Sequence, residues 1–225
     1  MLTHGYFTAM HTVVSLALAG PDAEAAIAVA ERIAVELDGR LSRFRPTSEV
    51  AALNASDKPI HVSDAVDRVL GLAVRYRQET EGRFDVTLGT GGLRRREPGV
   101  WQADGKVDLG GIGKGFCVDE ILAAWQGLDL EYGYLSFGQS SIGCFGEHTW
   151  RLGIRAGGQL LGPVEIGAGR VSTSAAAGYP EAGLRLATVL GDAAAACEAW
   201  STALVVGGER LLARLPKTMR TILKR

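Results

Sequence analysis

Glu198 and Thr202 have residue types and a spacing that suit cation binding. They lie four residues apart in CEAWSTAL, residues 197–204, where the apolar pattern predicts a helix. Residues four apart share one helix face, so the carboxylate and hydroxyl oxygens are expected to project together. Two such oxygen donors suit a hard cation such as Mg²⁺. The more common alternative for an isolated E-x-x-x-T is a solvated helix face.

A glycine-rich turn is the second candidate. It lies in VDLGGIGKGFCVDEIL, residues 107–122, where four glycines and Lys114 precede a predicted helix yet match neither the Walker nor the dinucleotide-binding pattern. Backbone without side chains can offer carbonyl oxygens to a cation and N–H groups to a phosphate. The alternative is a tight strand-to-helix connection without a ligand, in which Lys114 is solvated rather than paired with phosphate.

The remaining polar residues give no catalytic pattern. The four histidines are scattered without metal-ligand spacing, so we predict no zinc site. Asp108 and Asp119 are interpreted as helix caps or surface charges. Neither G-x-S-x-G nor H-E-x-x-H occurs, which excludes the common hydrolase patterns.

The composition is that of a packed globular protein. The chain has 225 residues, 47% of them hydrophobic, and a net charge of −1, so nothing in its charge predicts nucleic-acid binding. Three widely spaced cysteines favour a reducing compartment, and we expect the cytoplasm. No apolar run approaches the ~20 residues of a membrane span.

Hydrophobic periodicity predicts an α+β fold, with an antiparallel or mixed sheet flanked by helices. Phe44 is expected to continue the core-facing stripe of the first helix. We predict strands at 12–18 and 184–190, several short strands between 132 and 174, and a strand or loop at 84–88. Helices are predicted from 22 to a stop at Pro46, from a Ser63 cap to a Gly82 cap, at 114–125, from an Asp192 cap to 206, and at 209–215.

The order of the motifs resembles the ApbE family, the FAD:protein FMN transferases. The matching blocks are TAMHTVVSLAL (8–18), LSRFRPTSEVAALN (41–54), GRFDVTLGTGGL (82–93), VDLGGIGKGFCVDEIL (107–122), GYLSFGQSSIGCFG (133–146), RVSTS (170–174) and CEAWSTALVVGG (197–208). The resemblance covers nearly the whole chain. It implies a single ApbE-like domain over residues 1–225, related to the T-fold, with a candidate subdivision near 126–131.

The resemblance also implies an activity. Family members bind FAD and Mg²⁺ and attach FMN through a phosphoester to a Thr or Ser of an acceptor flavoprotein, releasing AMP. Three residues match the family's metal-binding positions. Gly113 stands where a main-chain carbonyl holds the metal, Glu198 stands where the family usually has an Asp, and Thr202 stands where it has a Thr or Ser. The positions expected to touch FAD are Met10, Phe44, Arg83, Phe84, Asp85, Gly110 and Phe116.

Several positions depart from the family pattern. The family's H-x-I-x-D-P-x-T-G segment has only a remnant here, Gly178-Tyr179-Pro180. His11 replaces a Gly, and Gln139 interrupts a Gly-Gly. Three hypotheses follow: an Mg²⁺-dependent flavin transferase, a non-catalytic FAD- or adenine-nucleotide-binding homologue, and an interaction protein with an empty cleft.

Overall fold

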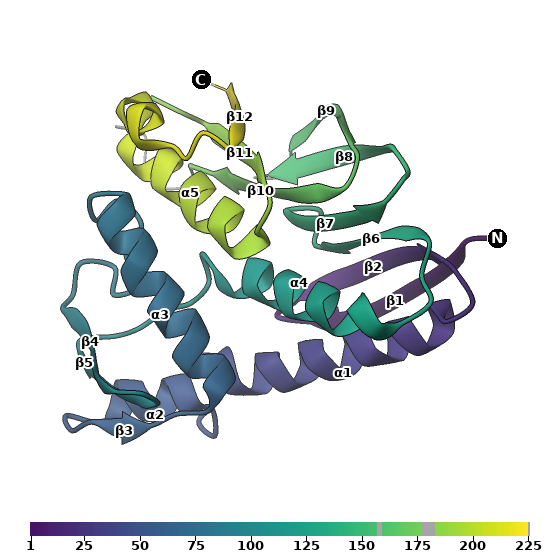
Figure 1. The fold of residues 1–225 in the computed structure, drawn as a ribbon. Helices are drawn as coiled ribbons and strands as arrows, with labels where there is room; N and C mark the ends of the chain where they lie inside the picture. Colours follow the sequence, from purple (N-terminus) through teal and green to yellow (C-terminus); the bar gives the residue numbers. More distant parts are fainter. Residues whose placement is uncertain (157–158, 177–182, 225) are drawn as a thin grey trace.

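A computed structural model describes residues 1–156, 159–176 and 183–224. Its centre is a seven-stranded sheet in the order β1-β2-β6-β7-β10-β11-β12 (Figure 1). Every neighbouring pair in this sheet is antiparallel. The strands are β1 (Thr3–Ala9), β2 (Thr12–Ala19), β6 (Tyr132–Phe137), β7 (Ser141–Gly146), β10 (Gly169–Ala175), β11 (Leu186–Gly191) and β12 (Arg220–Lys224).

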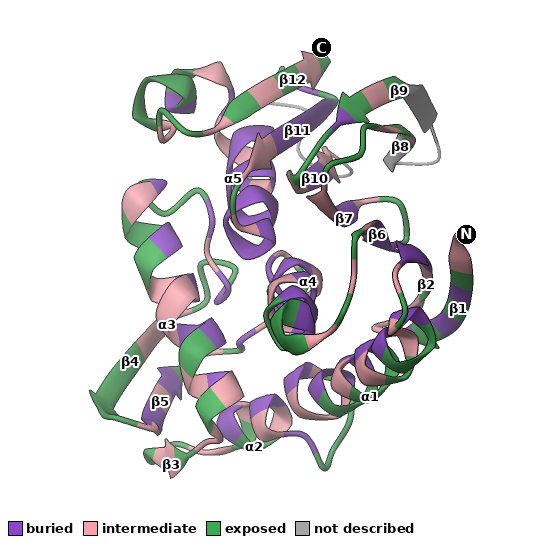
Figure 2. Cartoon of the chain, turned by 45° about the vertical axis from the view of Figure 1, so that its right-hand side comes forward, coloured by how far each residue is buried: buried purple, intermediate pink, exposed green. Residues whose placement is uncertain are grey.

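Three helices cover one face of this sheet: α1 (Ala23–Leu41), α4 (Gly113–Ala124) and α5 (Ala194–Gly207). The helix α4 lies between the other two and packs against both, while α5 packs on β10 and β11. Figure 2 shows α5 buried over most of its length, as its Ala-, Leu- and Val-rich sequence requires. A carboxylate on α5 is therefore placed in the interior.

Smaller elements complete the two sides. Beside α1 lie α2 (Glu49–Ala55), α3 (Asp64–Glu79) and the three-stranded sheet of β3 (Ile60–His61), β5 (Val100–Asp104) and β4 (Gly92–Glu97). The hairpin of β8 (Trp150–Ala156) and β9 (Gln159–Ile166) contributes to a second, smaller cluster around Ile142, Cys144, Ile166 and Val171. Two 3₁₀ helices, η1 (Trp125–Gly127) and η3 (Glu209–Arg214), follow α4 and α5.

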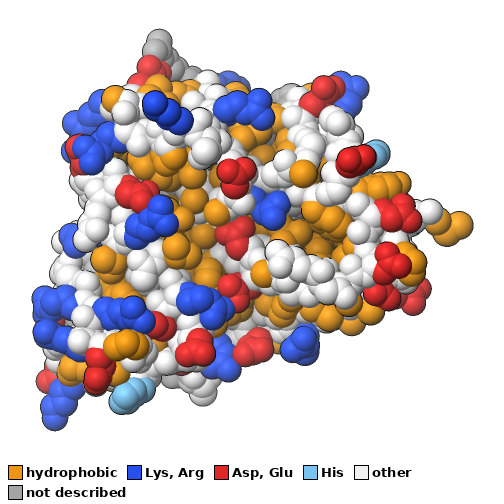
Figure 3. Space-filling view, in the orientation of Figure 1, with side chains coloured by type: hydrophobic (Ala, Val, Ile, Leu, Met, Phe, Trp, Pro, Cys, Tyr) orange, Lys and Arg blue, Asp and Glu red, His pale blue; other side chains and the backbone are white. Residues whose placement is uncertain are grey.

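The α+β prediction is confirmed, and the sheet is wholly antiparallel. The helix predicted from Ser63 is α3, and it buries Val66, Val69, Leu70, Ala73 and Tyr76 on one face. The strand predicted at 12–18 is β2. Within the described residues, every helix is too short or too polar to cross a membrane. The face in Figure 3 intersperses acidic and basic side chains rather than gathering one sign.

Some predicted boundaries were wrong. The first helix ends at Leu41, before Pro46, so Phe44 leaves the core stripe and is 68% exposed. The Gly82 cap was misplaced, because α3 ends at Glu79 with Thr80 in the cap position. The predicted Asp192 cap was wrong, because Ala193 holds that position without a side-chain hydrogen bond. The last predicted helix is the 3₁₀ helix η3. The elements that we did not predict include β1, α2, β3, the β4–β5 hairpin and β12.

Candidate functional site

The glycine-rich turn is held in place by Asp108. Its backbone N–H donates to the Val86 carbonyl at 2.7 Å, and its Oδ1 accepts from the Gly110 N–H at 2.9 Å. Its Oδ2 pairs with Arg43 Nε at 3.0 Å. The N–H of Gly113 then bonds the Leu109 carbonyl at 2.8 Å and begins α4. Asp108 is therefore an anchor of the turn rather than a free surface charge.

The helices α4 and α5 cross in close contact at Gly115. A Cβ on Gly115 would lie 2.3 Å from the Ala194 carbonyl oxygen, so only glycine allows this approach. The crossing places Glu198, which is 3% exposed, against the first turn of α4. The Gly115 N–H donates to Glu198 Oε2 at 2.7 Å, and Lys114 Nζ donates to Oε1. Both carboxylate oxygens therefore bond the start of α4.

Thr202 lies one helical turn beyond Glu198 and faces the glycine turn. A Cβ on Gly111 would lie 3.4 Å from Thr202 Oγ1, so the two segments are in contact. Thr202 Oγ1 lies 3.2 Å from the Ser174 hydroxyl, which also lies 2.8 Å from the Ser201 hydroxyl. The sequence predicted that Glu198 and Thr202 share a helix face, and the structure brings both to the turn. Their role as metal ligands stays a prediction.

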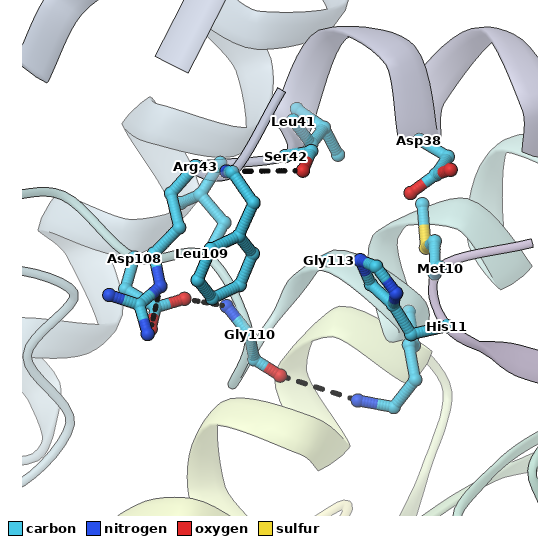
Figure 4. A pocket seen from close by; sticks show the side chains of 12 residues that line it. Met10, His11, Asp38, Leu41, Ser42, Arg43, Asp108, Leu109, Gly110 and Gly113 are labelled. Atoms are coloured by element: carbon cyan, nitrogen blue, oxygen red, sulfur yellow. Dashed lines mark hydrogen bonds and ion pairs between the residues drawn. The ribbon is translucent and has the colours of Figure 1, made fainter. Parts of the chain in front are cut away.

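One cavity lies between this turn, the end of α1 and the β1–β2 turn. Its volume is about 140 Å³, and Figure 4 shows Met10 and His11 on one side and Arg43 and Asp108 on the other. It is lined by Met10, His11, Asp38, Leu41, Ser42, Arg43, Phe44, Asp108, Leu109, Gly110, Gly113 and Lys114. The two cations in this lining are paired, Arg43 with Asp108 and Lys114 with Glu198.

A second cavity of about 500 Å³ lies on the other side of the turn. Thr202 and Ser174 line it together with Gly110 and Gly111, and Arg83 contributes a positive charge. The described residues of its lining are Gly82, Arg83, Phe84, Asp85, Val86, Leu88, Gly89, Asp108, Gly110, Gly111, Ser174, Ala175, Thr202, Val205 and Val206. Because Asp108 and Gly110 line both cavities, the turn separates two adjacent spaces.

Most positions expected to touch FAD line these cavities. Met10 and Phe44 line the first, Arg83, Phe84 and Asp85 line the second, and Gly110 lines both. Phe116 differs: its side chain is 3% exposed and packs in the core. Ser174 is a cavity residue to which sequence reasoning assigned no role. Its position at the end of the RVSTS block, which resembles the family pattern, could have indicated a role in the site.

The carboxylate of Asp85 is largely occupied by its own loop. Its Oδ1 accepts from the Thr87 N–H at 2.9 Å and from the Thr87 hydroxyl at 2.8 Å, and its Oδ2 pairs with Arg77 at 3.3 Å. These bonds hold the segment that carries Phe84 and Leu88. Asp85 therefore shapes the wall of the second cavity.

The donor chemistry of the turn and α5 suits a hard cation. Carboxylate, hydroxyl and main-chain carbonyl oxygens come from Glu198, Thr202 and the segment that includes Gly113. Among the described residues, no three His, Cys, Asp or Glu side chains gather into a metal-binding group. The candidate metal ligands are therefore one carboxylate, one hydroxyl and one main-chain carbonyl. The carboxylate, that of Glu198, is paired with Lys114.

Asp119 provides the second carboxylate link between the two helices. Its Oδ1 and Oδ2 accept from the N–H groups of Ala194 (2.8 Å) and Ala195 (2.9 Å), which makes it the cap of α5. Burial raises the pKa of this carboxyl above its ordinary value, and these two hydrogen bonds only partly oppose the shift. Of the two sequence interpretations of Asp119, the cap is correct, but the helix it caps is α5.

The fold and the site define an α+β protein in which a glycine turn and a buried helix meet between two cavities. The ApbE family model matches residues 10–92 and 90–178, and the chain belongs to the ApbE family. The remnant Gly178-Tyr179-Pro180 lies outside the described residues.

Solved structures of similar fold cover almost the whole chain. A variant of the flavin transferase ApbE from Vibrio cholerae superposes with a TM-score of 0.82 at 21% identity, covering 100% of this chain and 97% of that one. The ApbE protein from Thermotoga maritima gives 0.85 at 17% identity, covering 99% and 94%. The Pseudomonas stutzeri flavinyl transferase ApbE gives 0.82 at 20% identity, covering 100% and 95%. No curated protein sequence is a significant match.

Proposed function

We propose that this protein is a flavin transferase that uses FAD as its donor. In this reaction a Thr or Ser hydroxyl oxygen of an acceptor protein attacks the phosphorus of the FMN half. The bond from that phosphorus to the bridging oxygen breaks, AMP leaves with the bridging oxygen, and the hydroxyl proton is lost to a base or to water. The product is FMN joined to the acceptor through a phosphoester. We place this activity in the cytoplasm.

The observation that carries the proposal is the meeting of the glycine turn with α5 between the two cavities. A pyrophosphate needs positive charge and a cation beside it. The turn carries Lys114, and Glu198 and Thr202 of α5 lie against it. FAD also has two bulky ends on either side of its pyrophosphate. Two adjacent cavities that share Asp108 and Gly110 suit a ligand of that form.

Each predicted site residue has a proposed part. Met10 and Phe44 would contact FAD in the first cavity, and Arg83, Phe84 and Asp85 in the second. Gly110 would lie against the pyrophosphate, and Phe116 would support the turn from the core. Gly113, Glu198 and Thr202 would hold Mg²⁺, which offsets phosphate charge when bound. Glu198 is free to do so only once Lys114 has left it.

The test is covalent labelling of an acceptor. The protein is incubated with FAD, Mg²⁺ and an acceptor that carries a D-x-x-T/S-type flavinylation sequence, and the intact acceptor mass is measured. We expect the mass of one FMN to be added, with AMP appearing in equal amount. FAD bound without acceptor labelling would contradict transfer. AMP and free FMN without labelling would indicate hydrolysis.

A non-catalytic FAD-binding protein is the second candidate. No histidine occurs among the described residues that line the second cavity, so a proton acceptor of that type is missing there. Titration with FAD, with and without Mg²⁺, separates this candidate from an interaction protein, which would bind FAD in neither condition. Labelling of the acceptor separates it from the transferase.

A further inference from the structure

The ion pair of Lys114 and Glu198 occupies the centre of the candidate site. Glu198 is 3% exposed, and its two oxygens are taken by Lys114 Nζ and by the Gly115 N–H. Lys114 Nζ also donates to the Gly110 carbonyl at 3.3 Å. The ammonium group therefore bridges the glycine turn and α5 as a cation that belongs to the chain itself.

This arrangement disagrees with a simple metal site. A divalent ion bonded to Glu198 and an ammonium bonded to the same carboxylate would repel each other at close range in a partly buried place. The ion must therefore displace Lys114. The lysine has room to leave, because its side chain is 24% exposed and lines the first cavity, whereas Glu198 is fixed inside α5.

We propose that Lys114 is an internal cation that competes with a divalent metal for Glu198 and, once displaced, pairs with phosphate in the first cavity. This rests on the proposed function in taking Glu198 to be a metal ligand and the anion to be a pyrophosphate. Lys114 then makes metal loading and anion binding interdependent: the metal is held less tightly alone, and the released ammonium strengthens phosphate binding. Lys114 therefore has opposite effects on the two ligands: it weakens metal binding and strengthens phosphate binding.

A purely structural ion pair would behave differently. Its loss would weaken the fold and, through the fold, all ligand binding in the same direction. The competition model instead predicts that Lys114→Met tightens metal binding and weakens phosphate binding. The matched control is Lys106→Met. Lys106 bonds the Asn54 carbonyl at 2.7 Å and lines neither of the two cavities of the site.

The first experiment is calorimetric titration of the full chain with Mn²⁺ in the absence of flavin. We expect Lys114→Met to bind Mn²⁺ about tenfold more tightly than the wild type, because no charge-assisted hydrogen bond has to be broken first. Lys106→Met should match the wild type. Equal Mn²⁺ affinity in wild type and Lys114→Met, or no binding by Lys114→Met, would overturn the proposal.

The second experiment titrates inorganic pyrophosphate at saturating Mn²⁺. Lys114→Met should bind it about tenfold more weakly than the wild type, since one charge-assisted contact is lost. Unchanged pyrophosphate affinity would overturn the second half of the proposal. Neither titration contains flavin, so absence of transfer activity would sink the proposed function and leave this inference standing.

A further variant covers the case in which Lys114→Met does not fold because Glu198 is left as an unpaired buried charge. Lys114→Met with Glu198→Gln removes both charges and is expected to fold. In this double variant Mn²⁺ should give no rise in the unfolding temperature. A rise equal to that of the wild type would show that Glu198 is not the ligand and would overturn the proposal.

Discussion

The helices α4 and α5 are joined at two places, because each helix carries a carboxylate that accepts backbone N–H bonds from the other. The two contacts, called here the Asp119 end and the Glu198 end, differ in the cation beside the carboxylate. Asp119 of α4 caps α5 through Ala194 and Ala195, and Glu198 of α5 bonds the Gly115 N–H in α4. At the first end the additional cation is Arg170, 3.6 Å from Asp119. At the second end it is Lys114, which lines a cavity.

The two contacts differ in how firmly the cation beside the carboxylate is held. Arg170 Nη1 is held by the carbonyls of Cys144 (2.9 Å) and Gly169 (3.0 Å), so the cation at the Asp119 end is tied to the sheet. Lys114 instead bonds the Gly110 carbonyl of the glycine turn at 3.3 Å and lines the first cavity. The Asp119 end therefore links α4 and α5 to the sheet, whereas the Glu198 end borders the first cavity.

The largest effect should come from opening both ends at once. In Gly115→Ala the new Cβ would meet the Ala194 carbonyl oxygen at 2.3 Å, so α4 and α5 must separate. We expect the free energy of unfolding to fall by about 3 kcal/mol, measured by urea denaturation. Gly39→Ala is the control, because nothing lies within 4 Å of a Cβ there. It should stabilise α1 by up to ~1 kcal/mol. Equal effects would contradict the close crossing.

Removing the structural cap alone should have a smaller effect. Asp119→Ala leaves the Ala194 and Ala195 N–H groups without their acceptor, so we expect a loss of about 2 kcal/mol in unfolding free energy. Mn²⁺ affinity should be unchanged, because this end does not reach the cavities. A change in Mn²⁺ affinity would show that the two ends are coupled.

The pH dependence of stability tests the burial of Asp119. Its pKa is raised in the folded state, so the folded protein binds this proton more tightly than the unfolded chain. The stability that comes from protonation of Asp119 is therefore fully present below the ordinary pKa of 3.8 and is lost as the pH rises through the folded-state pKa, whereas the bonds from the Ala194 and Ala195 N–H groups remain. The unfolding free energy of wild type minus Asp119→Asn should fall with pH across that window. If this difference rose with pH instead, the hydrogen bonds to Asp119 would lower its pKa by more than burial raises it.

A substitution at His11 should affect the unfolding free energy and the FAD affinity through different causes, the backbone strain and the cavity lining. Its φ of 58° is in the left-handed region, where a glycine is unstrained, and it lines the first cavity. His11→Gly should gain about 1 kcal/mol in unfolding free energy. Its FAD affinity should differ from that of the wild type, because the imidazole lines the cavity. Glu81→Gly, with φ of 54° outside both cavity linings, should gain stability without changing FAD affinity. Weaker FAD binding in both variants would contradict the cavity assignment.

The smallest expected effect is on the cysteine thiols. All three are buried, and burial raises the pKa of Cys144 and of Cys197 to about 12. Burial also raises the pKa of Cys117 in α4. We expect no alkylation by iodoacetamide at pH 8 in the native protein and three modified thiols in urea, counted by mass. Native labelling of Cys117 would show that the α4–α5 contact opens.

Periodicity predicted α1 and α3, because each buries one apolar face. The apolar stretches of α4 and α5 predicted these two helices, which are buried on most sides. Periodicity missed β1, in which Phe7 is the one large apolar side chain among the buried positions Gly5, Phe7 and Ala9, and α2, which has only seven residues. The spacing of Glu198 and Thr202 predicted their shared face. The partners of Glu198 could not be predicted, because Lys114 and Gly115 are more than eighty residues away and meet it only through the helix crossing.

The most direct test is a crystal structure of the protein with FAD and Mn²⁺, in which anomalous scattering locates the metal. The account predicts the ion bonded to Glu198 and Thr202, the pyrophosphate on the glycine turn, and Lys114 moved from Glu198 to a phosphate oxygen. An ion elsewhere, or Lys114 still bonded to Glu198 beside a bound metal and FAD, would contradict it.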